Sequence, residues 1–238
     1  IHKVIDPLFL DELKAEFEEI RNIAVKRTRE RKLQDFQKKL STLTFLDPAC
    51  GSGNFLTETY LSLRRLENEI LQELQGGQMV LGYDNMNPIQ VSISQFYGIE
   101  INDFAVTVAK TALWIAESQM MKETESIVLM HLDFLPLKTN AFIHEGNALQ
   151  VDWESVIPKY QLSYIMGNPP FVARAGRTKA KDSSSKGMLD DTQKTDRLNV
   201  FGEDLGNVDY VACWFKKAAV FTKNTAIRCA FVATDSIC

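Results

Sequence analysis

Residues 167–171 read Gly-Asn-Pro-Pro-Phe and directly follow a strand-like run at 162–166. Neither proline has a backbone N–H, so the strand must end there, and the Pro169 carbonyl stays free to accept. The Asn168 side chain adds a second acceptor, and Phe171 adds a flat apolar face. This set suits a planar NH₂ group on an aromatic base. Holding both N–H bonds out of the ring plane would free the nitrogen lone pair to attack an electrophilic methyl group.

The alternative for this corner is a rigid Pro-Pro turn that binds nothing. That alternative gives no role to the asparagine and the phenylalanine on either side of the prolines. We therefore count Pro170, which belongs to the same corner, with the candidate substrate-binding residues.

A second candidate site is the glycine turn at residues 46–56, between a predicted strand and a predicted helix. Gly51 and Gly53 permit a tight turn and a close ligand approach, and the helix N-terminus offers free N–H groups to an anion. Leu56 stands where a dinucleotide fingerprint has its third glycine, which favours a nucleoside bearing a carboxylate over a pyrophosphate. Asp47 could hold an ammonium group or order the loop. The alternative is a glycine turn without a ligand.

Two further predicted strands also end in polar side chains. The strand at 96–101 carries Glu100, which can accept both hydroxyls of a ribose, and Ile101, which could lie against a purine. The alternative for Glu100 is a solvated acid. The strand at 141–144 is followed by Asn147, which could contact an adenine amino group. Parallel strands share their carboxyl edge, so these groups and the glycine turn predict one pocket for an adenosine that carries an amino acid.

Alternating strands and helices must position these residues. Strands are expected at 44–46, 96–101, 141–144, 162–166 and 228–234, and helices at 56–74, 104–121 and 209–221. This order predicts an α/β fold with a doubly wound, mostly parallel sheet. Residues 1–42 are charged and helical in rhythm, which predicts an N-terminal helical extension before a core at 43–238. Residues 172–207 are polar without a period, which predicts a flexible loop.

Composition narrows the class of protein. The chain has 238 residues, 45% hydrophobic and 24% charged, which fits one large globular domain. Its net charge of −4 means that any surface for nucleic acid must be local. Four cysteines show no CxxC pair and no zinc spacing with a histidine, so no metal is expected and a reducing compartment fits. No apolar run suits a membrane span and no signal peptide is visible, which predicts a cytoplasmic protein with no membrane partner.

The motifs and their order resemble those of gamma-class S-adenosylmethionine-dependent DNA amino-methyltransferases, which have a Rossmann-like class I fold. The shared motifs are Asp47–Gly53, Gly98–Glu100, Gly146–Asn147 and Asn168–Phe171. Further stretches are similar to the MmeI-like (Type IIL) enzymes, in which one polypeptide carries restriction and modification. These stretches are Pro7–Leu13, Leu63–Glu67 and Gln95–Glu100.

The resemblance implies methyl transfer from S-adenosylmethionine to the N6 amino group of an adenine flipped out of double-stranded DNA. It implies that the cofactor is held by Asp47, Ala49, Gly51, Gly53, Glu100, Ile101 and Asn147. It implies that the adenine is held by Asn168, the Pro169 carbonyl and Phe171. Arg174 and Arg177 follow this motif and could lie on DNA phosphates, with a solvated loop as the alternative.

Both ends of the chain look cut, so we expect a piece of a longer bacterial protein. The resemblance places a nuclease domain upstream and a target recognition domain downstream, with the C-terminal edge of the sheet truncated. Two other functions stay open. RNA and protein-glutamine methyltransferases also use an Asn-Pro-Pro-aromatic motif, and the chain could be a catalytically incomplete binding fragment.

Overall fold

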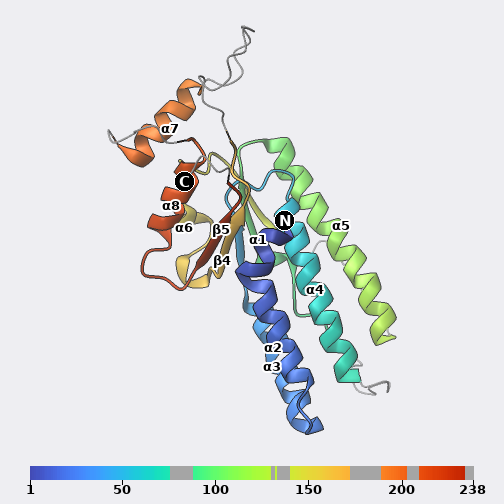
Figure 1. Cartoon of the computed structure of the whole chain (residues 1–238). Coiled ribbons are helices and arrows are strands. Elements are labelled where there is room, and N and C mark those ends of the chain that lie inside the picture. The colour runs from blue at the N-terminus through green and yellow to red at the C-terminus, as the bar shows by residue number, and fades with distance from the viewer. Residues whose placement is uncertain (76–87, 130–131, 133–139, 172–188, 203–208, 234–238) are drawn as a thin grey trace, which may run out of the picture.

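The computed structural model describes residues 1–75, 88–129, 132, 140–171, 189–202 and 209–233. Its centre is a five-stranded parallel sheet in the order β3-β2-β1-β4-β5 (Figure 1). The strands are β1 Phe45–Asp47, β2 Phe96–Glu100, β3 Phe142–Glu145, β4 Tyr164–Gly167 and β5 Arg228–Phe231. The strand order reverses between β1 and β4. The predicted α/β fold with a doubly wound parallel sheet is therefore confirmed.

Helices cover both faces of this sheet (Figure 1). One face carries α1 His2–Ile5, the π-helical turn η1 Asp6–Leu10, α2 Asp11–Arg21, α3 Lys26–Thr42, α4 Asn54–Gln75 and α5 Asp103–Val128. The other carries α6 Trp153–Val156 and α8 Ala212–Phe221, and α7 Asp191–Phe201 packs next to α8 beyond the carboxyl edge of the sheet (Figure 1). Short 3-10 turns, η2 Ile93–Gln95 and η3 Lys159–Gln161, lead into β2 and β4. No helix in the described ranges is long and apolar enough to cross a membrane.

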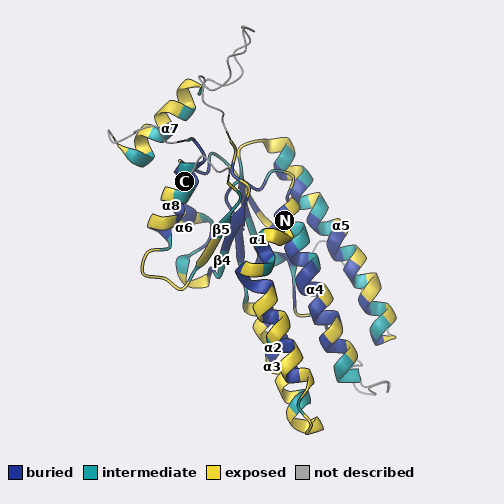
Figure 2. Ribbon diagram, viewed as in Figure 1, coloured by how far each residue is buried: buried dark blue, intermediate teal, exposed yellow. Residues whose placement is uncertain are grey.

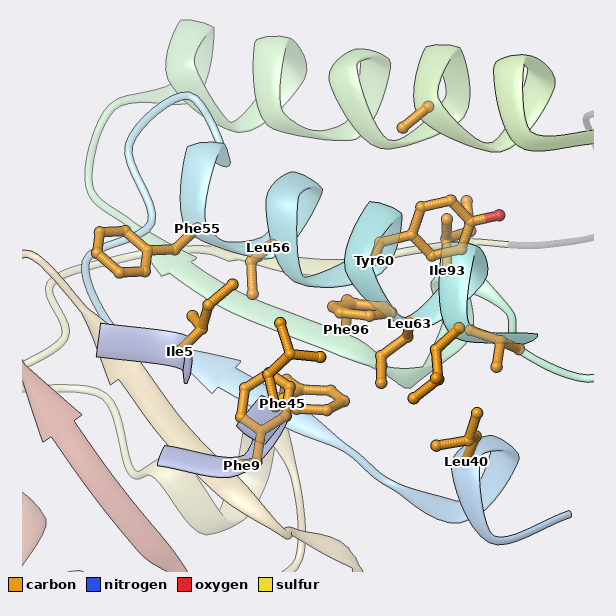
Figure 3. Close-up of a cluster of buried hydrophobic side chains, with 14 of the residues drawn as sticks. Ile5, Phe9, Leu40, Phe45, Phe55, Leu56, Tyr60, Leu63, Ile93 and Phe96 are labelled. Carbon is orange, nitrogen blue, oxygen red and sulfur yellow. The ribbon is translucent and has the colours of Figure 1, made fainter. Parts of the chain in front are cut away.

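Aromatic rings join the N-terminal helices to the sheet. The Phe45 ring stacks between Phe96, with ring centroids 5.2 Å apart, and Tyr164, at 5.4 Å. Phe9 of η1 lies 5.1 Å from the same ring and is fully buried (Figure 3). The helices expected in residues 1–42 are thus present, and they share one hydrophobic core with the sheet while their outer faces stay exposed (Figure 2).

A buried polar network ties three of these helices together. Arg64 and Glu67 of α4 form a fully buried ion pair. The Arg64 guanidinium also donates to the Thr124 hydroxyl of α5 over 2.7 Å, and the Gln37 amide of α3 donates to Glu67 over 2.8 Å. Buried charges of this kind are tolerated when partners satisfy them, and here the partners fix how α3, α4 and α5 pack.

The structure differs from the sequence prediction at α7, inside the expected loop at 172–207. A capping box begins this helix, because the Asp190 side chain accepts from the Gln193 N–H and the Gln193 side chain accepts from the Asp190 N–H. Within α7 only Asp196 is buried. The helix therefore has no periodic apolar face. A periodic apolar face is the sequence signal from which a helix is predicted, so this helix was missed.

Candidate active site

A pocket of ≈ 460 Å³ opens at the carboxyl edge of the sheet, beside the point where the strand order reverses. Residues that follow four different strands line it. The sequence-predicted residues in its lining are Ala49, Glu100, Ile101, Asn147, Asn168 and Pro170. Residues far apart in the chain meet here because parallel strands end at one edge.

Other predicted residues lie outside this lining. Asp47, Gly51, Gly53, Pro169 and Phe171 do not line the pocket. Pro169 is buried, whereas the Phe171 side chain is 43% exposed at the surface. Arg174 and Arg177 lie outside the described residues.

The glycine turn is joined to the end of β2 through Glu100. The Gly51 N–H donates to one Glu100 carboxylate oxygen over 2.9 Å, and the Asn102 N–H donates to the other over 3.0 Å. Gly53 adopts φ +81°, and a Cβ at this position would lie 3.0 Å from the Ala109 Cβ. Glycine at this position therefore allows both the turn and its close packing on α5.

Asp47 connects the glycine turn to the end of β4, the strand that precedes Asn168. Its side chain is buried and accepts from the Ala49 N–H over 3.0 Å. Burial raises the pKa of this carboxyl to about 7, and the nearby negative charge of Glu100 adds to the shift. A Cβ at Gly167, the last residue of β4, would overlap the Asp47 carboxylate. The two strand ends are thus in direct contact.

The loop after β3 is held by a lysine and a tryptophan. The Lys217 ammonium of α8 donates to three carbonyls of this loop, those of Ala148 over 2.8 Å, Leu149 over 3.0 Å and Val151 over 2.6 Å. The Trp153 indole N–H also donates to the Ala148 carbonyl over 2.8 Å. Burial lowers the pKa of Lys217. These bonds fix the backbone next to Asn147.

Sequence reasoning missed a second wall of the pocket. It comes from α7 and the start of α8 and consists of Asp190, Thr192, Gln193, Asp196, Tyr210 and Trp214. The Trp214 indole donates to the Pro48 carbonyl over 3.0 Å, which anchors the glycine turn from this side. The capping-box pair Asp190 and Gln193 is the one local signal that could have revealed α7.

Cys50 takes no visible part in the chemistry of this site. It is buried against Gly98, and burial raises the pKa of its thiol. A protonated thiol is a poor nucleophile, so Cys50 acts as a packing residue. Within the described part of the chain, no three His, Cys, Asp or Glu side chains gather as metal ligands.

Comparisons with known proteins agree on one family. Residues 23–238 match the family model for the DNA-methyltransferase domain of MmeI. The chain is 38% identical over 242 residues to DNA methyltransferase A of Bacillus subtilis strain 168; this match covers 100% of the chain and 25% of that protein. A putative type II restriction enzyme and methyltransferase of Methanocaldococcus jannaschii is 26% identical over 137 residues, covering 57% of the chain and 11% of that protein.

Among solved structures, the Type IIL restriction–modification enzyme MmeI in complex with DNA has a similar fold. It superposes with a TM-score of 0.84 at 43% sequence identity, covering 98% of the chain and 29% of the MmeI chain. The chain therefore spans about a quarter of the Bacillus subtilis protein and 29% of the MmeI chain.

Proposed function

The chain belongs to the family of MmeI DNA-methyltransferase domains, and from this premise we propose that it methylates the N6 amino group of adenine in DNA. The methyl donor that we propose is S-adenosylmethionine. One observation carries this proposal: Asn168 shares a pocket with Glu100 and Asn147. The acceptor site and the cofactor site can then face each other within one pocket.

The pocket residues fit the chemical groups of the proposed cofactor. S-adenosylmethionine, when bound, supplies a methyl group on a positively charged sulfur. Glu100 accepts one backbone N–H on each carboxylate oxygen, which leaves lone pairs for the two ribose hydroxyls. Ile101 is 66% exposed beside the pocket and would pack against the purine, while Asn147 would bind its polar edge.

The glycine turn would hold the methionine end. Ala49, Gly51 and Gly53 would lie along it, because this turn leads into the N-terminus of α4. The buried carboxyl of Asp47 accepts the Ala49 N–H and so supports this turn. A ligand ammonium near this turn would favour the ionised form of the Asp47 carboxyl, and the two opposite charges would then attract each other.

The Asn-Pro-Pro-Phe corner would hold the adenine. The Asn168 side-chain oxygen and the Pro169 carbonyl would accept the two N–H bonds of its amino group. Pro170 lines the same pocket and would border the base, and the exposed Phe171 ring would stack on it once the base has left the duplex. Asn168 is neutral and holds the amino group in place; the proton released after transfer would pass to water.

We propose double-stranded DNA as the partner, with Arg174 and Arg177 on its phosphates. The nuclease and target recognition functions would come from other parts of a longer polypeptide. A restriction–modification enzyme of this kind would act on DNA in the bacterial cytoplasm.

Replacing Asn168 by alanine in the full-length protein tests the mechanism. We expect methyl transfer from labelled S-adenosylmethionine to duplex DNA to fall by about 100-fold or more, since a positioned transition-state contact is lost. Binding of S-adenosylhomocysteine, measured by calorimetry, should stay within about threefold. Asn22→Ala, at the exposed end of α2, is the matched control and should keep full activity.

Two results would contradict this proposal. Full activity of Asn168→Ala would discard the mechanism. Transfer of the label to RNA or to protein, with none to duplex DNA, would discard the substrate.

A further inference from the structure

Three donors from separate parts of the chain converge on the carboxylate of Asp196. The Asn147 amide, after β3, donates to one of its oxygens over 2.8 Å, and the Tyr210 hydroxyl donates to the same oxygen over 2.9 Å. The Gln150 amide donates to the other oxygen over 2.9 Å. Asp196 is 1% exposed, although it comes from α7, whose other residues are exposed or half-buried. Asp196 is therefore buried by these specific hydrogen bonds. It is not buried as part of an apolar helix face.

This contact defines how the Asn147 amide is oriented. The amide nitrogen faces the Asp196 carboxylate, which accepts, and the amide oxygen faces the Leu149 N–H, which donates over 2.9 Å. A flipped amide would set oxygen against oxygen on one side and N–H against N–H on the other. Leu149 fixes the position of the oxygen, and Asp196 fixes the position of the nitrogen.

The oriented amide keeps unused hydrogen-bonding capacity. Its oxygen has a second lone pair, and its nitrogen has a second hydrogen. Asn147, Asp196 and Tyr210 all line the pocket proposed for the cofactor. One acceptor beside one donor is the pattern that complements an adenine, whose amino group donates and whose adjacent ring nitrogen accepts.

We propose that Asp196 is a positioning residue that makes Asn147 selective for the adenine of the nucleoside cofactor. This inference rests on the proposed function, because it assumes that the pocket holds an adenosine. It gives α7 a role in cofactor recognition, because this helix supplies the Asp196 carboxylate that holds the Asn147 amide in one orientation. A hypoxanthine carries a carbonyl in place of the amino group, so it would set oxygen against the Asn147 oxygen and be rejected.

The test compares two ligands on full-length protein by calorimetry: S-adenosylhomocysteine and its inosine counterpart, S-inosylhomocysteine. Wild-type protein should prefer the adenosine compound by about tenfold or more, the discrimination typical of one bidentate amide–adenine pair. Asp196→Asn keeps the size of the side chain but offers a donor as well as an acceptor, so it no longer opposes the flipped Asn147 amide, and only the Leu149 N–H still does. We expect it to lower the preference at least about fivefold. Asp191→Asn makes the same charge change at a 98% exposed side chain of α7 and should keep the wild-type preference.

The outcomes separate positioning from a purely structural role. If Asp196→Asn weakens both ligands equally and leaves their ratio unchanged, Asp196 only supports the fold and the inference is overturned. Equal affinities of the wild type for the two ligands would also overturn it, whether or not the variant folds. Failure of the wild type to bind either ligand would overturn the proposed function as well, which distinguishes that failure from the other two.

Discussion

The buried carboxyl of Asp47 should make the stability of this protein depend on pH in an unusual direction. Burial raises its pKa from 3.8 to about 7, so between these values the native state holds a proton that the unfolded state has released. A native state that binds more protons loses stability as the pH rises. We therefore predict that this group stabilises the fold fully below pH 4, progressively less up to pH 7, and not at all above it.

The size of the effect follows from the same two values. The full span corresponds to about 4 kcal/mol of unfolding free energy, of which about 3 kcal/mol is lost between pH 5 and pH 8. Asp47→Asn keeps an oxygen that can accept from the Ala49 N–H but cannot titrate. Other titrating groups are common to both proteins, so their contributions cancel in the difference between the two stability curves.

Urea unfolding of wild type and Asp47→Asn, followed by circular dichroism at pH 5, 6, 7 and 8, measures this difference. We expect the stability of the variant relative to wild type to increase by about 3 kcal/mol from pH 5 to pH 8. Asp35→Asn removes an exposed carboxyl of α3 and serves as the control. Parallel curves for wild type and Asp47→Asn would refute the reasoning, because they would mean that Asp47 titrates alike in the folded and unfolded chains.

Three further substitutions test how the site is supported. Gly53→Ala should cost about 1–2 kcal/mol of stability and weaken S-adenosylhomocysteine binding, because φ is +81° and the space is filled. Gly51→Ala shares the backbone strain, at φ +53°, but meets open space and should cost less; an equal loss would show that the contact with Ala109 adds nothing. Lys217→Met should cost about 2 kcal/mol, since three carbonyls of the 148–151 loop lose a charged donor, and thermal unfolding would show no change if the loop were held otherwise. Phe9→Ala should cost about 3–5 kcal/mol in urea unfolding, and a loss below about 1 kcal/mol would show that η1 does not complete the core.

Much of the site could be predicted because a general rule places it. Parallel strands end at one edge, so polar residues after successive strands must meet there, however far apart they lie in the sequence. Glu100 ends β2, Asn147 and Asn168 follow β3 and β4, and the structure brings the three to one pocket. Their individual roles toward cofactor and base remain predictions.

Other features left no periodic signal in the sequence. Helix α7 buries only Asp196, so neither its helical state nor its place on the pocket follows from apolar spacing. The contact of Asp196 with Asn147 joins residues 49 positions apart through one hydrogen bond. Likewise, the packing of Phe9 on Phe45 depends on how the chain returns to the sheet, which local propensity does not specify.

Identification of the methylated nucleoside tests the central claim most directly. Duplex DNA is incubated with the full-length protein and S-adenosylmethionine carrying an isotope-labelled methyl group, then digested and analysed by mass spectrometry. We predict labelled N6-methyldeoxyadenosine, absent when Asn168→Ala replaces the wild type. Label on cytosine, or label on adenine that persists in Asn168→Ala, would contradict the claim that this asparagine holds an adenine amino group for methylation.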